Sequence, residues 1–295
     1  MTRAQLQASV AARLGSPAEA RWLLEEVLGP EAGRPGPARG AVVDDDRIQR
    51  VEALVARRRS GEPLQYLVGH WAFRRLDLVV DPRVLIPRPE TEQLVDVALD
   101  ELARLVSRPG SDGAVVVDLG TGSGAIALAL AVEATERWPD LRVLATDASA
   151  DALAVAEENR DRVAATWPAA RKVTLAGGRW WDAVDPAERG RVDLVVSNPP
   201  YVAEADFPGL DPTVRLWEPR GALVAPDRDG VSGLGDIAAV LADAATWLRP
   251  GGVVVVEIDP GQADGALGVA RRAGLVDGRT EDDLAGRVRM VVARR

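Results

Sequence analysis

The sequence predicts an α/β fold, a parallel sheet covered by helices on both faces, preceded by a small all-helical domain. From residue 114 onward, short apolar segments rich in β-branched residues alternate with segments of helical periodicity, which is typical of such a sheet. Residues 1–60 show helical periodicity and no strand pattern. We therefore expect a helical domain over 1–70, a linker over 71–86 and an α/β domain over 87–295.

The composition disfavours several classes of protein. Of the 295 residues, 47% are hydrophobic and 27% charged, as in ordinary soluble domains, and no apolar run approaches the roughly 18 residues of a membrane span. The absence of cysteine excludes disulfides, thiolate catalysis and Cys-ligated zinc. A net charge of −9 disfavours binding to nucleic-acid phosphates. The start lacks the apolar core of a signal peptide. We expect a cytoplasmic, monomeric protein that binds no metal, no membrane and no nucleic acid directly.

The N-terminal helices are predicted from apolar residues that recur at helical spacing, such as Leu6, Val10 and Leu14. A Pro- and Gly-rich stretch over 29–40 is expected to form a surface loop. Over 71–86, alternating apolar and β-branched residues predict a hairpin or an extended linker. Thr91 is then expected to cap a helix that begins there and ends near residue 107.

The elements of the α/β domain follow from its alternating patterns. Glycines and polar residues separate the apolar runs from the helical segments. The predicted strands cover 114–120, 142–147, 172–178, 191–198, 251–258 and 287–295, and the predicted helices cover 125–134, 150–160, 237–248 and 262–273.

A glycine-rich turn joins the first of these strands to its helix. Gly120, Gly122 and Gly124 follow Asp118 there, and glycine lets the backbone and the helix N-terminus approach a ligand closely. The spacing G-x-G-x-G differs from the G-x-G-x-x-G of dinucleotide-binding folds. The next strand ends at Asp147, whose carboxylate can accept hydrogen bonds from both hydroxyls of a ribose. The ribose could belong to either NAD or S-adenosylmethionine (SAM), and these residues do not decide between the two cofactors. The alternative role of Asp147 is a helix cap.

Two tryptophans follow the third strand. An aromatic ring offers a large contact area to an adenine face, and Trp180 or Trp181 is placed to supply it. The alternative is that both are ordinary core residues. We expect one of them to lie in the core and the other beside the ligand.

The fourth strand ends in Asn198-Pro199-Pro200-Tyr201. Two prolines fix two φ angles and remove two backbone donors. The Asn198 side chain and the Pro199 backbone then offer two rigid carbonyl oxygens, which suit the two hydrogens of a planar NH₂ group, and Tyr201 can stack on it. An amide or an aromatic amine held in this way is oriented for attack on the methyl group of SAM, a reaction that needs positioning more than an acid or a base.

These motifs carry a resemblance to a known family. The segment DLGTGSG over 118–124, Asp147 and NPPY resemble the seven-stranded SAM-dependent methyltransferases. Residues 61–73, residues 84–95 and the C-terminal DLAGRVRMVVARR closely resemble the peptide chain release factor glutamine N5-methyltransferases (the PrmC/HemK family). The resemblance covers nearly the whole chain. It implies a seven-stranded Rossmann-like sheet, a helical N-terminal domain that recognises the protein substrate, and SAM as cofactor with S-adenosylhomocysteine (SAH) as product.

The resemblance also implies roles for single residues. The acceptor would be the glutamine of the Gly-Gly-Gln loop of class 1 release factors. The catalytic residues of the enzyme would be Asn198 and Pro199. The glutamine would also contact Pro200, Tyr201 and the segment that contains Arg88. Glu257 and Gln262 fit the family pattern E-I-x-x-x-Q. The cofactor would lie against Gly120, Thr121, Gly122, Ser123 and Gly124, with Asp147 at the ribose, Trp180 at the adenine and Asn198 at its border.

The sequence departs from the family pattern at two places, and other functions compete. Arg179 stands where the family often has an acidic residue, and Asp259-Pro260 replaces a more usual glycine-containing turn. A ribosomal-protein glutamine methyltransferase shares much of the pattern, but LIPRPETE over 85–92 favours the release-factor enzymes. A DNA adenine-N6 methyltransferase would need a basic recognition region. A nicotinamide oxidoreductase would not explain NPPY, and the intact corner argues against a non-catalytic binding protein.

Overall fold

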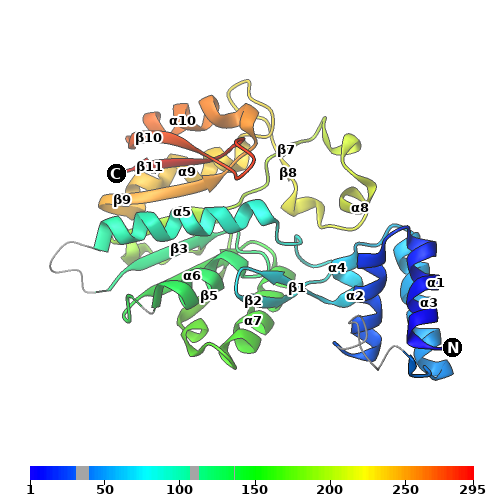
Figure 1. The fold of residues 1–295 in the computed structure, drawn as a ribbon. Coiled ribbons are helices and arrows are strands. Elements are labelled where there is room, and N and C mark those ends of the chain that lie inside the picture. The colour runs from blue at the N-terminus through cyan, green and yellow to red at the C-terminus, as the bar shows by residue number, and fades with distance from the viewer. Residues whose placement is uncertain (31–39, 107–112, 136) are drawn as a thin grey trace. The chain divides into compact units, whose positions relative to one another are not determined.

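The computed structural model describes residues 1–30, 40–106, 113–135 and 137–295, so most of the loop expected over 29–40 lies outside the described residues (Figure 1). The chain divides into two compact units. The first consists of Met1–His70 together with Asp211–Trp217, and the second of Trp71–Leu210 together with Glu218–Arg295.

The first unit is helical. Its three longer helices follow residues whose side chains accept a hydrogen bond from the first turn, as helix caps do: Thr2, Ser16 and Asp44. Fully buried side chains such as Leu6 and Leu23 form its core. The helices of this unit are α1 (Arg3–Leu14), α2 (Pro17–Leu28), α3 (Asp45–Arg59), α4 (Leu64–Val68) and the short α8 (Pro212–Arg215).

The second unit is built on a sheet of seven strands among the described residues, in the order β10-β11-β9-β6-β3-β4-β5. Five neighbouring strands, from β9 to β5, are parallel, whereas β11 runs antiparallel to both β9 and β10. The sheet is therefore mixed: the predicted parallel arrangement holds for the five strands from β9 to β5, and β11 departs from it. The strands are β3 (Val115–Leu119), β4 (Arg142–Asp147), β5 (Val173–Gly177), β6 (Val192–Ser197), β9 (Leu248–Glu257), β10 (Val276–Asp282) and β11 (Val288–Arg294).

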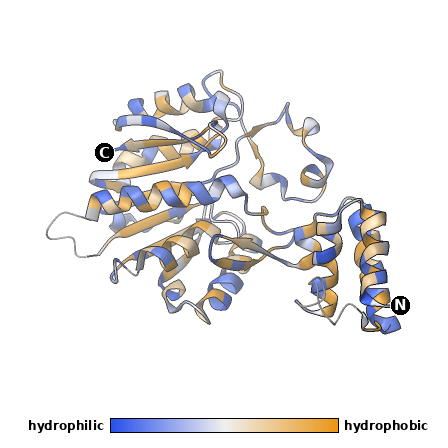
Figure 2. Ribbon diagram, viewed as in Figure 1, coloured by the Kyte–Doolittle hydropathy of each residue, from blue (hydrophilic) through white to orange (hydrophobic). Residues whose placement is uncertain are grey.

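Helices cover both faces of this sheet (Figure 1). Alternate strand residues enter two separate cores: Val116 packs with α5, α6 and α7, and Val117 packs with α9 and α10. Figure 2 shows that the central strands are mostly hydrophobic, whereas a helix such as α5 mixes hydrophilic and hydrophobic residues along its length. The helices are α5 (Pro89–Val106), α6 (Ala125–Thr135), α7 (Ala150–Ala164), α9 (Gly235–Trp247) and α10 (Ala263–Arg272).

Smaller elements complete the second unit. Strands β1 (His70–Phe73) and β2 (Leu76–Val79) pair as the hairpin expected in the linker, and Phe73, Leu76 and Leu78 join the core beside α5. Strands β7 (Val202–Ala203) and β8 (Val224–Ala225) form a second two-stranded sheet. The 3-10 helices are η2 (Pro168–Lys172), η3 (Trp180–Ala183), η4 (Pro186–Glu188), η5 (Phe207–Gly209), η6 (Arg220–Ala222) and η7 (Pro260–Gln262).

Candidate active site

The strand register brings the predicted site residues into one row. Asp118 on β3 pairs with Val196 on β6, so Gly120 and Asn198 leave adjacent strands at the same level. The pairing of Leu119 with Thr146 places Asp147 beside Gly120, and the pairing of Ser197 with Val256 places Glu257 beside Asn198. The carboxyl ends of four parallel strands thus present Glu257, Asn198, Gly120 and Asp147 in this order, at the edge where such sheets bind ligands.

The glycine turn owes its shape to three left-handed residues. Gly120, Gly122 and Gly124 have φ angles of 75°, 56° and 82°, which side chains other than glycine adopt at a cost. A Cβ atom on Gly124 would lie 3.2 Å from the Cδ1 atom of Leu128, whereas one on Gly122 would meet nothing within 4 Å. Gly124 therefore serves helix packing, and Gly122 faces open space in which its backbone can meet a ligand.

Asp118 lies buried beneath this turn. Its Oδ2 atom accepts hydrogen bonds from the Thr121 hydroxyl at 2.6 Å and from the Ala127 backbone N–H at 3.2 Å. Its Oδ1 atom is buried without a hydrogen-bond partner among the described residues. Burial raises the pKa of Asp118 to about 7, although both hydrogen bonds oppose this rise. The Thr121 side chain is thus used inside the protein, which leaves the backbone of the turn to contact a ligand.

Asp147 holds the other side of the turn. Its Oδ2 atom accepts a hydrogen bond from the Gly122 N–H at 2.9 Å, and its Oδ1 atom accepts one from the Ser149 N–H at 2.8 Å. The residue that caps α7 is Ser149, whose hydroxyl accepts from the Ala152 N–H, so the alternative role of Asp147 as the cap is wrong. Burial raises the pKa of Asp147. The backbone N–H of Ala148 also interacts with this carboxylate. A carboxylate has about four lone-pair sites, so Asp147 can still accept a hydrogen bond from a ligand.

The two tryptophans have different surroundings. Trp180 has a φ of 48°, and its Cζ3 atom lies 3.2 Å from where a Cβ on Gly120 would be. Trp181 is buried, stacks on Trp247 with ring centroids 5.4 Å apart and donates a hydrogen bond to the Val240 carbonyl at 3.0 Å. Trp181 is therefore a core residue and Trp180 lies against the glycine turn, while a contact between Trp180 and an adenine stays a prediction.

An acidic group does face Trp180, but it comes from another element. The Oδ1 atom of Asp236, in the first turn of α9, accepts hydrogen bonds from the Arg179 guanidinium at 2.8 Å and from the Trp180 ring N–H at 3.3 Å. The departure from the family pattern at Arg179 thus leaves a carboxylate beside the indole. Sequence reasoning missed Asp236 because it lies 57 residues from Arg179.

Asn198 is held by a chain of two hydrogen bonds. Its side-chain Nδ2 atom donates to the Thr91 hydroxyl at 3.1 Å, and that hydroxyl donates to the Glu257 carboxylate at 2.8 Å. The Asn198 Oδ1 atom and the Pro199 carbonyl accept no hydrogen bond from the described residues. Helix α5 begins at Pro89, so Thr91 lies inside its first turn and the expectation that it caps the helix is wrong. Its hydroxyl contacts the corner instead.

Side chains from distant segments support the rest of the corner. The Nε2 atom of Gln262 donates hydrogen bonds to the Tyr201 carbonyl at 2.8 Å and to the Ser232 carbonyl at 2.9 Å. A Cβ atom on Gly233 would lie 2.2 Å from the Tyr201 carbonyl oxygen, so only glycine fits there. Burial, with the charge of Glu257, raises the pKa of Tyr201 to about 12, so its phenol stays neutral. Gln262 thus holds the backbone of Tyr201, the last residue of the corner, against the segment of Ser232.

Arg88 also has a buried partner. The Glu218 side chain is 1% exposed, pairs with the Arg88 guanidinium and accepts a hydrogen bond from the Ile86 N–H at 3.1 Å. A buried carboxylate needs such partners. The pair fixes the segment that leads into α5, and a contact between Arg88 and a substrate stays a prediction.

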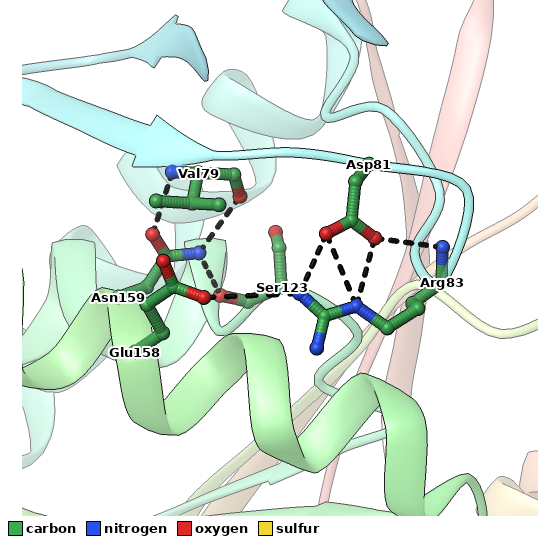
Figure 3. A network of polar contacts seen from close by, with 6 residues as sticks. All are labelled: Val79, Asp81, Arg83, Ser123, Glu158 and Asn159. Atoms are coloured by element: carbon green, nitrogen blue, oxygen red, sulfur yellow. Dashed lines mark hydrogen bonds and ion pairs between the residues drawn. The ribbon is translucent and has the colours of Figure 1, made fainter. Parts of the chain in front are cut away.

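A further polar network joins the linker hairpin to the glycine turn (Figure 3). The Asn159 side chain on α7 is fully buried. Its Oδ1 atom accepts from the Val79 N–H at 2.6 Å, and its Nδ2 atom donates to the carbonyls of Val79 at 3.0 Å and Ser123 at 2.9 Å. Beside it, Arg83 pairs with Asp81 and lies 3.7 Å from Glu158. One buried amide thus connects three segments of the second unit.

Comparisons with known proteins identify the family. A family model described as Methyltransferase small domain matches residues 92–209, and one described as PrmC N-terminal domain matches residues 3–69. A release factor glutamine methyltransferase of Geobacter sulfurreducens is 38% identical over 94% of this chain and 88% of the relative. One of Gloeobacter violaceus is 40% identical over 93% and 89%. The chain belongs to the release factor glutamine methyltransferase family.

A solved structure supports the fold of this family member. The structural match to the N-terminal domain of human METTL16 in complex with SAH covers 88% of this chain and 87% of the METTL16 chain, with a TM-score of 0.51 and 13% sequence identity. Membership confirms the resemblance drawn from the motifs, and it makes the protein a methyltransferase and therefore an enzyme. The predicted fold class is confirmed as well.

The structure brings most of the predicted site residues of this methyltransferase together at one edge of the sheet, and their contacts with a ligand stay predictions. Besides Asp236, sequence reasoning missed Asn159 and the contacts that the Thr91 hydroxyl makes. One signal was available for Asn159, because Asn159 and Asn198 are the only asparagines in the chain. In the described part of the chain, no group of three acidic, His or Cys side chains is placed to hold a metal ion. No helix there is long and apolar enough to cross a membrane.

Proposed function

We propose that the enzyme transfers a methyl group from SAM to the side-chain amide nitrogen, N5, of the glutamine in the Gly-Gly-Gln motif of class 1 peptide chain release factors. One observation carries the proposal. A rigid corner with two unoccupied carbonyl acceptors, on Asn198 and Pro199, lies on the strand next to the glycine turn. The names of the curated relatives support the release factor as substrate.

The residues of the turn fit SAM. Gly122 leaves open space above its backbone, Asp147 keeps lone pairs for a ribose, and the ring of Trp180 lies over Gly120 for an adenine. Gly120 to Gly124 would hold the methionyl part through backbone groups, because the Thr121 and Ser123 side chains are buried. When bound, SAM supplies an electrophilic methyl group on a positively charged sulfur, and SAH is the product that remains.

The chain's own residues orient the acceptor. An amide nitrogen is a weak nucleophile because its lone pair is delocalised into the carbonyl group. The Asn198 Oδ1 atom and the Pro199 carbonyl accept hydrogen bonds from its two N–H groups. These bonds increase the electron density on the nitrogen and orient its lone pair toward the methyl group. Tyr201, neutral and largely buried, offers an aromatic face to the planar amide. The nitrogen gives one proton to water as its new bond to carbon forms.

The helical first unit is assigned to recognition of the release factor. The match of residues 3–69 to the PrmC N-terminal domain supports this role. Release factors act on cytoplasmic ribosomes, so we place the enzyme in the cytoplasm, and we expect a monomer. Neither a metal nor a direct contact with nucleic acid enters the reaction.

A methyl-transfer assay tests the proposal. The purified enzyme is incubated with methyl-labelled SAM and a recombinant class 1 release factor, and the control is the same factor with Gln→Ala in its Gly-Gly-Gln loop. We expect label on the unmodified factor and none on the control, with the methyl group located on N5 by fragmentation mass spectrometry. Label on both factors, or on a ribosomal protein or adenine-containing DNA instead, would overturn the assigned acceptor.

A further inference from the structure

We propose that Thr91 and Glu257 form a positioning relay that sets which way the Asn198 side-chain amide faces. In the productive orientation the Asn198 oxygen points to the acceptor nitrogen and the Asn198 NH₂ group points to Thr91. The catalytic consequence rests on the proposed function, whereas the orientation itself is a property of the free enzyme.

The relay follows from counting protons. An ionised carboxylate only accepts hydrogen bonds, so the single proton of the Thr91 hydroxyl goes to Glu257, 2.8 Å away. The hydroxyl oxygen then has only lone pairs to offer, and it can face the NH₂ end of Asn198 but not its oxygen. In the structure the Asn198 Nδ2 atom does donate to the Thr91 oxygen, at 3.1 Å. The Asn198 Oδ1 atom is left for a substrate.

If the direction of these hydrogen bonds is reversed, Asn198 can no longer accept a hydrogen bond from the substrate amide. A protonated Glu257 can donate its own proton to the Thr91 oxygen. The Thr91 proton is then free to point at Asn198, which is best satisfied when the amide turns by 180° and presents its oxygen to Thr91. Such a turn changes the shape of an amide very little. The turned Asn198 would direct N–H groups at the N–H groups of the acceptor amide, and two donors do not bind each other.

The surroundings of Glu257 place this exchange near neutral pH. Its side chain lies in the core, and burial raises its pKa to about 7. The hydrogen bond from Thr91 opposes the rise. Charged and titratable groups from the neighbouring elements also act on it: Arg289 on β11 and Arg88 before α5 lower the pKa, Glu90 on α5 raises it, and Tyr201 lies close enough to interact with its charge.

A pair of Thr91 variants tests the catalytic consequence. Thr91→Val keeps the shape of the side chain and removes the hydroxyl, and Thr91→Ser keeps the hydroxyl. We expect Thr91→Val to lower kcat at least about tenfold while the Kd for SAM changes less than about threefold, and Thr91→Ser to stay within about threefold of wild type in both. Equal kcat values for the two variants, with SAM binding intact, would overturn the proposal.

Nuclear magnetic resonance tests the orientation without any turnover. Because the chain has only two asparagines, the full-length protein labelled with ¹⁵N-asparagine gives two side-chain NH₂ pairs, and Asn198→Ala identifies one of them. We expect the Asn198 pair to shift with a midpoint near pH 7 in the wild type and not in Glu257→Gln. The Asn159 pair is the internal reference. An Asn198 pair that does not change with pH, or that changes alike in both proteins, would overturn the relay.

The two kinds of failure are distinguishable. If the wild-type enzyme transfers no methyl group to a release factor, the proposed function fails, and the spectra still decide whether Thr91 and Glu257 orient Asn198. If the enzyme is active but the spectra and the Thr91 pair show no dependence on the hydroxyl, the relay fails and the proposed function stands.

Discussion

The glycine turn and the Asn198 corner lie side by side but obtain their shapes in different ways. The turn over 120–124 is shaped by its own backbone, with three left-handed glycines and hydrogen bonds to the end of the adjacent strand β4. The corner is shaped by the side chains of Thr91 on α5 and Gln262 in η7, which lie 107 and 61 residues from the corner residues that they contact. Glu257 on β9 in turn holds Thr91. Local sequence thus defines the cofactor side, and tertiary packing defines the acceptor side.

The largest effect should come from Asn198→Ala. We expect kcat for glutamine methylation to fall roughly 10²- to 10³-fold, the range for removing one preorganised hydrogen-bonding group in an active site. The Kd for SAM, measured by calorimetry, should change less than about threefold. If the affinity for SAM fell as steeply as kcat, the two regions would not have separate tasks and the comparison would fail.

Asp147→Ala should act on the other region. We expect the Kd for SAM to rise about 10- to 100-fold, because hydrogen bonds to a charged group contribute about 1.5–3 kcal/mol. At saturating SAM, kcat should change far less. Asp151→Ala, in the exposed first turn of α7, removes the same charge and should leave the Kd unchanged. An unchanged Kd in Asp147→Ala would mean that the ribose is held elsewhere.

Asn159→Ala probes whether the glycine turn depends on support from outside. The variant loses three hydrogen bonds of a fully buried side chain and leaves Val79 and Ser123 backbone groups unpaired. We expect the free energy of unfolding to fall by about 2–3 kcal/mol in urea titrations. Glu158→Ala, on the same helix but exposed, should change it by less than about 0.5 kcal/mol. Equal effects would show that the turn needs no such anchor.

The last prediction concerns the dependence of stability on pH. Asp118 and Glu257, one in each region, have pKa values near 7 in the folded enzyme and near 4 when exposed. Between these values the folded state binds more protons, so the free energy of unfolding falls as the pH rises from about 4 to about 7, by at most about 1.4 kcal/mol per pH unit and group. Asp118→Asn should flatten this slope. A slope that stays the same in the variant would contradict the burial of an ionisable Asp118.

The local origin of the glycine turn explains what sequence could predict. Strands such as β3 and β6 are mostly apolar, and the turn residues stand next to each other in the chain. Strand β10 was not predicted, because its residues are mostly polar and exposed and it is defined by its pairing with β11. The antiparallel direction of β11 follows from the same pairing and leaves no mark in its own sequence.

Long-range contacts limited the prediction of the site. Thr91 has the sequence of a helix cap, and only the packing of α5 against β9 reveals that its hydroxyl faces Glu257, 166 residues away. Trp180 and Trp181 are identical residues in sequence, and the stack of Trp181 on Trp247 decides which of them enters the core. The roles of these residues depend on contacts with residues distant in sequence, which a local sequence pattern cannot predict.

The position of β11 has a consequence for biosynthesis. The ribosome makes β9 before β10 and β11, yet β11 is the strand that lies between the other two. Until β11 has been made, Val253 to Val256 present an unpaired, strongly apolar strand edge, which is a template for aggregation. We therefore expect the nascent chain to be prone to aggregation at this stage, and a shortened version that stops before Val288 to be prone to it for the same reason.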